Sequence, residues 1–206
     1  MARLPEPLSR HDRQRQTREA LIFAARRVFS EDGYHAATLE RIAREAGFSK
    51  GAVYSNFDDK SALFLAVMDS NLALAEGDAM DPFERQAGPA STGRGIGDRE
   101  GYSHEATQGF ALATLEFIAR AARDEQLAAQ MHQRLAALLD SYTEIARAGR
   151  PDDEVLSAPE VGTLLAALDQ GAGLIELAGG VVADTQLFNA GMRRLVDPAR
   201  ASAERE

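Results

Sequence analysis

Apolar residues recur every three or four positions along most of this chain, which is the period of an α-helix with one buried face. Between residues 38 and 57 the apolar positions that can share the inner faces of two short helices are Leu39, Ile42, Ala43, Ala46, Val53 and Phe57. No stretch reads as a strand, and no internal repeat is present. The pattern therefore predicts an all-α fold.

Five longer helices are predicted after this segment, at residues 60–76, 104–123, 125–148, 159–179 and 185–196. They are separated by glycine and proline positions, and the longest gap, residues 77–103, is rich in Gly, Pro and Ser. Loops of that length in compact domains are usually functional or disordered. The GRGIG run inside it is not a phosphate loop, because no strand precedes it and no Gly-Lys-Ser/Thr follows.

Residues 38–57 carry the capping signals of two helices joined by a tight turn. Thr38 is a good N-cap for the first helix, and Gly47 suits the left-handed conformation that ends it. Phe48 is placed to fill the corner, and Ser49 can cap a second helix that begins at Lys50. Two short helices joined in this way form a helix-turn-helix unit, whose second helix enters the DNA major groove.

The outward positions of the second helix suit contact with DNA. They are Lys50, Gly51, Ala52, Tyr54, Ser55 and Asn56. Small residues allow close approach, and Lys50 and Lys60, the only lysines of the chain, add positive charge on either side. Asp58 or Asp59 would cap the next helix. Two structural alternatives remain. Tyr54 could fill the junction between helices, and similar helix-turn-helix units also occur in helical proteins that do not bind DNA.

The same residues resemble the DNA-binding domain of TetR-type transcriptional repressors. The resemblance rests on Thr38, Ile42, Ala43, Ala46 to Tyr54, Phe57, Lys60 and Leu63, and on Ala24, Phe29, Gly33 and Tyr34 in the preceding helix. It implies contacts to base edges and nearby backbone from Ser49, Lys50, Gly51 and Ala52. It implies phosphate contacts from Thr38, Tyr54, Asn56 and Lys60. With Ser55 on the same surface, these form the predicted DNA-binding set.

Charge divides the chain into a basic head and an acidic body. Residues 1–60 contain 11 Lys and Arg against 9 Asp and Glu, whereas residues 61–206 contain 12 against 23, within an overall net charge of −9. Only the DNA footprint has to be positive. We predict a flexible arm at 1–12, a helix-turn-helix domain at 13–59, and a helical domain for effector binding and dimerisation at 60–206, including the 77–103 loop.

Composition indicates a cytoplasmic bacterial protein. There is no cysteine, no apolar run of membrane-spanning length, and a polar, arginine-rich N-terminus that does not read as a signal peptide. The near-absence of lysine beside many arginines is typical of a GC-rich genome.

The last two predicted helices are candidates for a dimer interface. The helix at 159–179 combines small and branched apolar residues in 161–168 and 171–175, which allows close approach of helices. The resemblance implies that the last two helices pair with their copies in a four-helix interface, and a two-half-site operator argues for the same. The candidate residues are Leu164, Leu168, Gly171, Leu174, Ile175, Phe188 and Met192. Ordinary core packing is the alternative.

An apolar ligand pocket is predicted in the body, lined by Phe110, Thr114, Phe117, Met131, Leu135 and Leu139. Glu116 is the only ionisable residue between Glu105 and Arg120. In a buried helix it needs a partner, which is either an internal arginine or a cationic or donor group of an inducer. His132 could line the same cavity. All these residues would equally suit a plain helical core.

The function predicted from sequence is a one-component, homodimeric repressor that leaves a palindromic operator when a small molecule binds. Two alternatives remain: a DNA-binding regulator without an effector, and a helical carrier or enzyme whose head is vestigial. No cofactor is predicted. The four histidines are too scattered for a metal site, and no arrangement of catalytic residues is recognisable.

Overall fold

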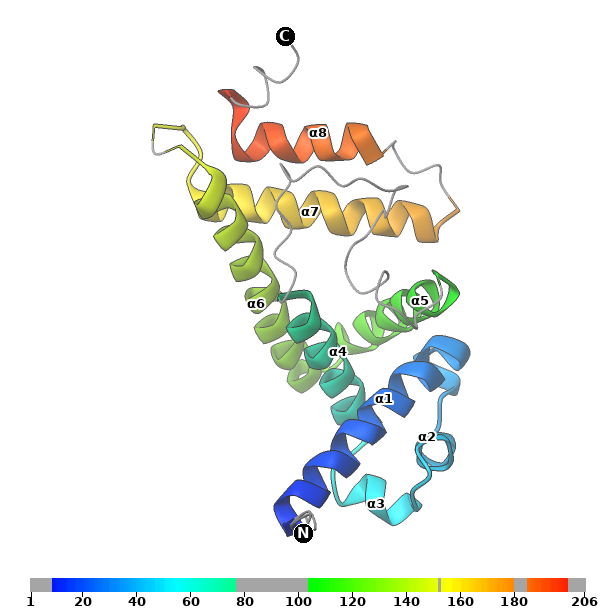
Figure 1. Ribbon diagram of the computed structural model, residues 1–206. Coiled ribbons are helices and arrows are strands. Elements are labelled where there is room, and N and C mark those ends of the chain that lie inside the picture. The colour runs from blue at the N-terminus through cyan, green and yellow to red at the C-terminus, as the bar shows by residue number, and fades with distance from the viewer. Residues whose placement is uncertain (1–8, 77–103, 152, 180–184, 200–206) are drawn as a thin grey trace, which may run out of the picture. The chain divides into compact units, whose positions relative to one another are not determined.

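The computed structural model describes residues 9–76, 104–151, 153–179 and 185–199. These residues form eight helices and no strand (Figure 1). The helices are α1 (Arg10–Ala36), α2 (Leu39–Glu45), α3 (Lys50–Tyr54), α4 (Lys60–Glu76), α5 (His104–Ala121), α6 (Glu125–Gly149), α7 (Ala158–Leu177) and α8 (Thr185–Val196). The predicted all-α fold is confirmed. None of the helices in the described ranges has the length and apolar character needed to cross a membrane.

The predicted helix boundaries agree with the structure to within two residues at each end. The helix expected at residues 185–196 has those limits, and the one expected at 60–76 is α4. The N-terminus differs, because Ser9 caps α1 through a capping box with Asp12 and the helix begins at Arg10. Residues 10–12 are therefore helical, where an arm was expected through residue 12. Residues 1–8 and the predicted 77–103 loop lie outside the described residues.

The chain divides into two compact units. The first comprises Met1–Ser70 together with Glu105–Phe117, and the second comprises Asn71–His104 and Ile118–Glu206. Residues 105–117, which are most of α5, thus belong to the same unit as the helix-turn-helix. We call the first unit the head unit and the second the body unit.

The head unit is built around five aromatic side chains from α1, α4 and α5. Phe64 stacks on Phe117 with ring centroids 4.7 Å apart and on Phe110 at 5.3 Å. Phe29 and Tyr34 of α1 meet Phe64 edge to face at 4.9 and 5.2 Å. Edge-to-face and offset-stacked rings are the favoured geometries of aromatic pairs. This cluster ties α5 to the helices that carry the DNA-reading segment.

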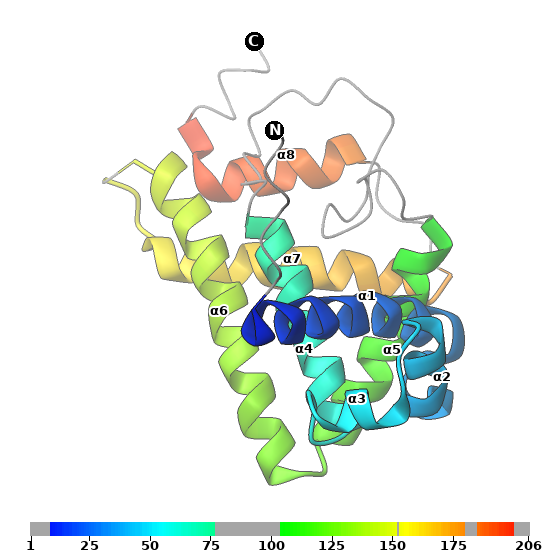
Figure 2. The same ribbon diagram turned by 60° about the horizontal axis from the view of Figure 1, so that its bottom comes forward.

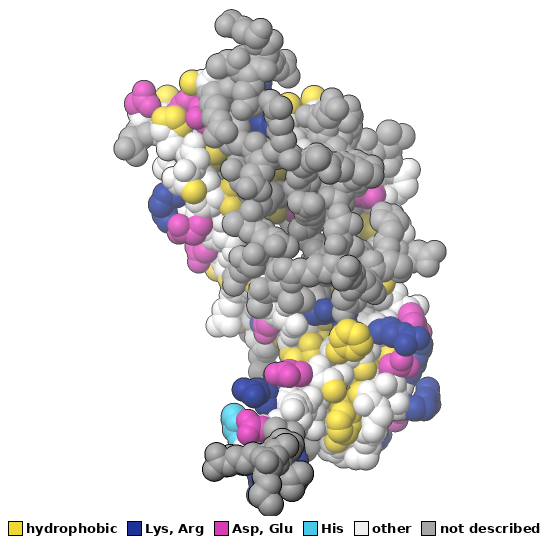
Figure 3. Space-filling model, viewed as in Figure 1, with side chains coloured by type: hydrophobic (Ala, Val, Ile, Leu, Met, Phe, Trp, Pro, Cys, Tyr) yellow, Lys and Arg dark blue, Asp and Glu magenta, His cyan; other side chains and the backbone are white. Residues whose placement is uncertain are grey.

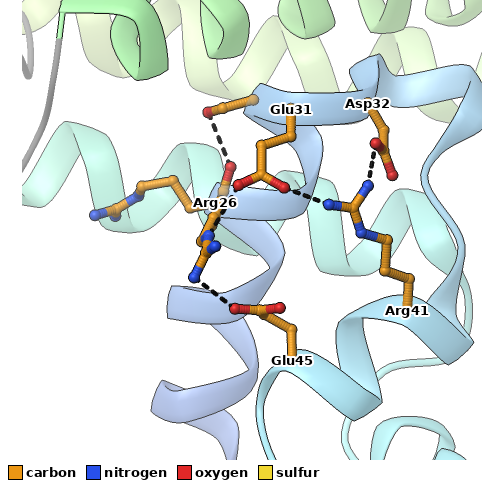
Figure 4. A network of polar contacts seen from close by, with 7 residues as sticks. Arg26, Glu31, Asp32, Arg41 and Glu45 are labelled. Carbon is orange, nitrogen blue, oxygen red and sulfur yellow. Dashed lines mark hydrogen bonds and ion pairs between the residues drawn. The ribbon is translucent and has the colours of Figure 1, made fainter.

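Ion pairs on the surface of the head unit link α1 to α2. Arg41 of α2 pairs with both Glu31 and Asp32 of α1, and both carboxylates point toward its guanidinium (Figure 4). Arg27 bonds Glu31 at 2.9 Å and Glu45 of α2 at 2.7 Å. The network holds the short helix α2, which has only two turns, beside α1.

In the body unit, α6, α7 and α8 enclose a separate apolar core. Figures 1 and 2 both show α7 and α8 running side by side. The buried members of the core are Tyr142, Ala146, Val161, Leu165, Ala166, Met192 and Val196. Gly162 allows α7 to approach α6 closely, since a Cβ there would lie 2.7 Å from the main-chain nitrogen of Thr143. The Tyr142 hydroxyl donates to Asp169 at 2.6 Å and joins the same two helices.

Candidate functional site

The helix-turn-helix predicted from the sequence is present in α2 and α3. The Thr38 hydroxyl accepts the Arg41 N–H at 3.2 Å, and the Ser49 hydroxyl accepts the Ala52 N–H at 3.3 Å, so both predicted N-caps are confirmed. Gly47 has a φ of +74° and ends α2 in the left-handed conformation. Each capping hydroxyl keeps its own hydrogen, which leaves both side chains able to donate to a phosphate.

Phe48 is only partly buried at the turn between α2 and α3. Its side chain is 37% exposed, while its main-chain N–H donates to the Ala43 carbonyl at 2.9 Å. Backbone hydrogen bonds and the glycine define the turn, and the inner face is filled by Val53 and Phe57, both buried. The expected role of Phe48 in the corner stays a prediction.

The outer side of α3 presents polar and small residues. Ser49, Lys50, Gly51, Tyr54 and Ser55 are exposed, and Ala52 is half-buried. The Ser55 hydroxyl donates to the Ala52 carbonyl at 2.9 Å, and the Asn56 amide nitrogen donates to the same carbonyl at 2.8 Å. The donors of Ser55 and Asn56 are thus turned back onto the end of α3, whereas the Asn56 side-chain oxygen is still available as an acceptor.

Lys50 forms an ion pair with Glu40 of α2 and lies 5.6 Å from the centroid of the Tyr54 ring. A hydrogen bond from Lys50 lowers the pKa of the Glu40 carboxyl, and the same bond raises the pKa of the lysine. Basic and acidic side chains also lie next to each other over α1 and α2 on the face shown in Figure 3. The candidate surface therefore carries its positive charge in ion pairs that an incoming phosphate would have to exchange.

Lys60 is oriented toward the protein and not toward the α3 surface. Its ammonium donates to the main-chain carbonyls of Tyr34, His35 and Ala37 at 2.8, 3.0 and 2.9 Å. The carbonyls of Tyr34 and His35 lie beyond the kink at Gly33 in the last residues of α1, and Ala37 is the C-cap of that helix. The geometry gives Lys60 a capping role that the sequence did not reveal, and its predicted phosphate contact stays a prediction.

Arg18 of α1 is a residue that the sequence analysis missed. Its guanidinium donates to the Asn56 carbonyl at 2.7 Å and lies 4.2 Å from the centroid of the Phe57 ring. It therefore fixes the end of α3 against α1. No local pattern marks it, because α1 contains several arginines and only the folded chain shows which of them faces α3.

The predicted pocket residues are distributed over both compact units. Phe110 and Phe117 are buried in the aromatic cluster of the head unit, which accounts for them without a ligand. On α6, Met131 is buried, whereas His132, Leu135 and Leu139 are exposed. The Thr114 hydroxyl donates to the Phe110 carbonyl at 2.9 Å. These placements leave the pocket a prediction.

Glu116 has a partner that was not foreseen. Its carboxylate accepts the main-chain N–H of His35 at 2.9 Å, so a backbone amide occupies the place that an arginine or an inducer was expected to take.

The predicted interface residues on α7 are largely exposed. Leu164, Leu168, Leu174 and Ile175 are 43, 40, 52 and 54% exposed, and a Cβ at Gly171 would meet nothing within 4 Å. On α8, Phe188 is half-buried against the body core, and Met192 is only 1% exposed. The side chain of Met192 is therefore enclosed within the protomer, because α8 turns it toward α6 and α7.

Comparison with known proteins gives the same picture as the geometry. The family model described as bacterial regulatory proteins, tetR family, matches residues 21–67, which include α2 and α3. The HTH-type transcriptional regulator UidR of Escherichia coli K12 is 28% identical over 172 residues, 82% of each chain. The HTH-type transcriptional repressor AcnR of Corynebacterium glutamicum is 39% identical over 62 residues, which cover 30% of this chain and 33% of AcnR.

The fold as a whole also has solved counterparts. The crystal structure of a TetR-family transcriptional regulator from Rhodococcus sp. superposes with a TM-score of 0.62 at 20% identity, covering 86% of this chain and 95% of the other. The capped helix-turn-helix, the match over residues 21–67 and this likeness of fold agree with one another. Residues 21–67 thus match the tetR family of bacterial regulatory proteins, and the likenesses together support a TetR-family regulator.

Proposed function

We propose that this chain is a homodimeric repressor whose head units bind the two halves of a palindromic operator, and which a small molecule releases. The observation that carries the proposal is the capped helix-turn-helix, with Lys50, Gly51 and Tyr54 exposed on α3. A recognition helix contacts base edges through its first residues, while capping hydroxyls and lysines contact the phosphates. Because its target is the chromosome, the protein acts in the cytoplasm.

The exposed apolar face of α7 supports the homodimer. Leu164, Leu168 and Ile175 are large apolar side chains with a substantial fraction of their surface open to solvent. Contiguous exposed apolar surface on a folded protein marks an interaction site. A two-fold dimer also places two heads on one face of the DNA, one or more helical turns apart, which a palindromic operator requires.

A buried amide on α4 supports a small-molecule effector. Asn71 is 3% exposed, and within the described part of the chain neither its side-chain nitrogen nor its side-chain oxygen has a hydrogen-bond partner. Buried polar groups are nearly always hydrogen-bonded, so an unpartnered pair needs an explanation. A ligand with both a donor and an acceptor, such as a carboxylic acid, an alcohol or an amide, would satisfy both atoms.

The second candidate function is a DNA-binding regulator without an effector. The aromatic cluster around Phe64 favours it, because Phe110 and Phe117 are buried there against other rings of the protein. The unsatisfied Asn71 argues against it. The proposal involves no enzymatic activity.

The experiment is operator selection followed by a binding titration. The purified protein selects sequences from random double-stranded DNA, and fluorescence anisotropy measures its affinity for the enriched sequence at two salt concentrations. The proposal expects a palindromic sequence, two protomers per site and an affinity that falls steeply with salt. Lys50→Ala should lower the slope of log affinity against log salt by about one. Selection of no sequence would refute DNA reading by this head.

The effector is tested with the same labelled operator. A library of small carboxylic acids, alcohols and amides is screened for compounds that lower the anisotropy of the complex. A hit that releases the operator supports the repressor with an effector. A library that leaves a tight, specific complex intact favours the regulator without one.

A further inference from the structure

A short corner joins α1 to the helix-turn-helix and fixes where α2 begins. Gly33 has a φ of +76° and a ψ of 172°, so it interrupts the helical geometry near the end of α1. Four residues later the Ala37 N–H donates to the Gly33 carbonyl, and the next residue, Thr38, caps α2. We call residues 33–37 the corner. Any change in its shape moves the start of α2 relative to α1.

Helix α5 packs closely against the C-terminal part of α1. At Gly109 an added Cβ would lie 2.1 Å from the Ser30 carbonyl oxygen of α1, so the two helices touch through their backbones. Two turns further along α5, on the same face, the Glu116 carboxylate accepts the His35 N–H at 2.9 Å. Phe117, beside it, lies 5.0 Å from the Tyr34 ring, centroid to centroid.

Glu116 and Gly33 fit each other sterically as well. An added Cβ at Gly33 would lie 2.7 Å from the Glu116 Oε1 atom. The absent side chain at Gly33 therefore provides the space that the carboxylate occupies, and the positive φ at the same residue is one that glycine adopts at least cost. The carboxylate thus contacts the corner through one hydrogen bond and through close van der Waals contact.

We propose that Glu116 is a positioning residue for DNA reading: its carboxylate holds the corner in the shape that orients the helix-turn-helix toward the operator. The inference rests on the proposed function, because it presumes that this head binds an operator. Residues 105–117 of α5 belong to the head unit and the rest of the helix belongs to the body unit. α5 is therefore the helix whose displacement would act directly on the corner.

Because Glu116 is charged, the direction in which its removal changes operator affinity tests the inference. A carboxylate in a DNA-binding head repels phosphates, so its removal alone should raise operator affinity. A positioning role predicts the opposite, because the corner loses its acceptor and the orientation of α2 becomes less defined. The two effects of one substitution therefore differ in direction.

The experiment compares Glu116→Ala, Glu116→Gln and Glu144→Ala on the sequence that the wild type selects from random DNA. Glu144 is an exposed residue of α6, and its substitution removes the same charge without touching the corner. Anisotropy titration at one salt concentration should show operator affinity lower by about 2- to 30-fold for Glu116→Ala. It should be retained in Glu116→Gln, whose amide oxygen can still accept the His35 N–H, and in Glu144→Ala.

Hydrogen exchange at the His35 amide provides a readout that does not depend on DNA. The amide should exchange faster in Glu116→Ala than in the wild type and regain protection in Glu116→Gln, while amides in the middle of α1 stay unchanged. If Glu116→Ala does not fold, Glu116→Asp serves instead. It keeps the charge, is one methylene shorter and should also lose affinity and His35 protection.

Two results would overturn the inference: an affinity for Glu116→Ala equal to or above that of the wild type, or a Glu116→Gln protein as weak as Glu116→Ala. A wild type that selects no sequence would instead remove the proposed function. Loss of His35 protection in Glu116→Ala would then still show that the carboxylate holds the corner, so the two failures are distinguishable.

Discussion

The Lys60 ammonium donates to the main-chain carbonyl of Tyr34 at 2.8 Å and lies 4.7 Å from the centroid of the ring of the same residue. It also bonds the carbonyls of His35 and Ala37. A lysine in the first turn of a helix is unfavourable in the dipole of that helix, and here the carbonyls at the end of α1 offset this. The corner between α1 and α2 is thus held through its carbonyls by Lys60 and through one amide by Glu116.

Replacing Lys60 should therefore lower the stability of the folded protein. Lys60→Met keeps most of the apolar stem and removes the three donors, which should reduce the free energy of unfolding by about 2 kcal/mol. Urea denaturation followed by circular dichroism measures the change. Lys50→Met is the matched control, because Lys50 is exposed and pairs with Glu40 on the surface, and it should leave stability unchanged. Equal stability of the two variants would contradict the capping role.

The ion pair between Lys50 and Glu40 predicts a gain of DNA affinity from removing an acidic residue. If Lys50 binds a phosphate, Glu40 loses its partner and acquires a negative neighbour. Glu40→Gln should therefore raise operator affinity by a few-fold near neutral pH. An anisotropy titration of both proteins measures the difference, and Glu19→Gln, an exposed carboxylate of α1, controls for net charge. A weaker Glu40→Gln complex would show that Glu40 helps to orient Lys50 for binding.

The pH dependence of the same pair has a defined sign. The hydrogen bond from Lys50 holds the pKa of Glu40 below its usual 4.5 in the free protein. DNA binding removes that bond, so the pKa of Glu40 rises and the complex takes up a proton as the pH falls toward this value. The affinity of the wild type should then approach that of Glu40→Gln on acidification, whereas a constant ratio between pH 7 and 4.5 would exclude the linkage. In the free protein the depressed pKa makes the pair stabilising above pH 4.5, and this is lost as the pH falls further.

Local signals in the sequence were sufficient for the helices and for the turn between α2 and α3. Caps such as Thr38 and Ser49 bond amides three residues away, and Gly47 acts through its own φ. Each of these features depends only on neighbouring residues, so it can be recognised in the sequence without knowledge of the fold. The same holds for Asp59, whose carboxylate accepts the Ala62 N–H at 2.7 Å.

The orientation of long side chains could not be predicted from the sequence, because it depends on partners that are far away along the chain. Lys60 contacts carbonyls more than twenty residues earlier, and Glu116 contacts an amide 81 positions away. Met192 has the helical spacing of an interface residue, but the packing of α8 on α6 and α7 encloses it. Hydrophobic periodicity gives the apolar face of a helix and does not say which neighbour covers it.

The end of α6 predicts one strongly destabilising substitution in the body unit. Arg150 is largely buried and donates to the Leu195 carbonyl of α8 at 2.6 Å and to the Leu156 carbonyl at 2.6 Å. Arg150→Met should lower the free energy of unfolding by about 3 kcal/mol, because two main-chain carbonyls lose a charged donor whose side chain is buried. Arg147→Met removes an exposed arginine one turn earlier and should have little effect. Urea denaturation compares the two, and equal midpoints would contradict a clamping role for Arg150.

The unsatisfied amide of Asn71 predicts a gain of stability from an apolar replacement. Leucine has nearly the same shape and removes two buried polar atoms that lack partners, so Asn71→Leu should raise the free energy of unfolding by about 1–2 kcal/mol. Thermal denaturation measures this change. Operator affinity should stay unchanged, whereas compounds that release the wild-type complex should fail to release the variant if the amide binds them. Ligand binding would then explain why Asn71, which lowers the stability of the protein, occupies this position. A variant less stable than the wild type would show that the Asn71 amide has hydrogen-bond partners in solution. If the compounds still release the operator from the variant, the effector binds elsewhere in the body unit.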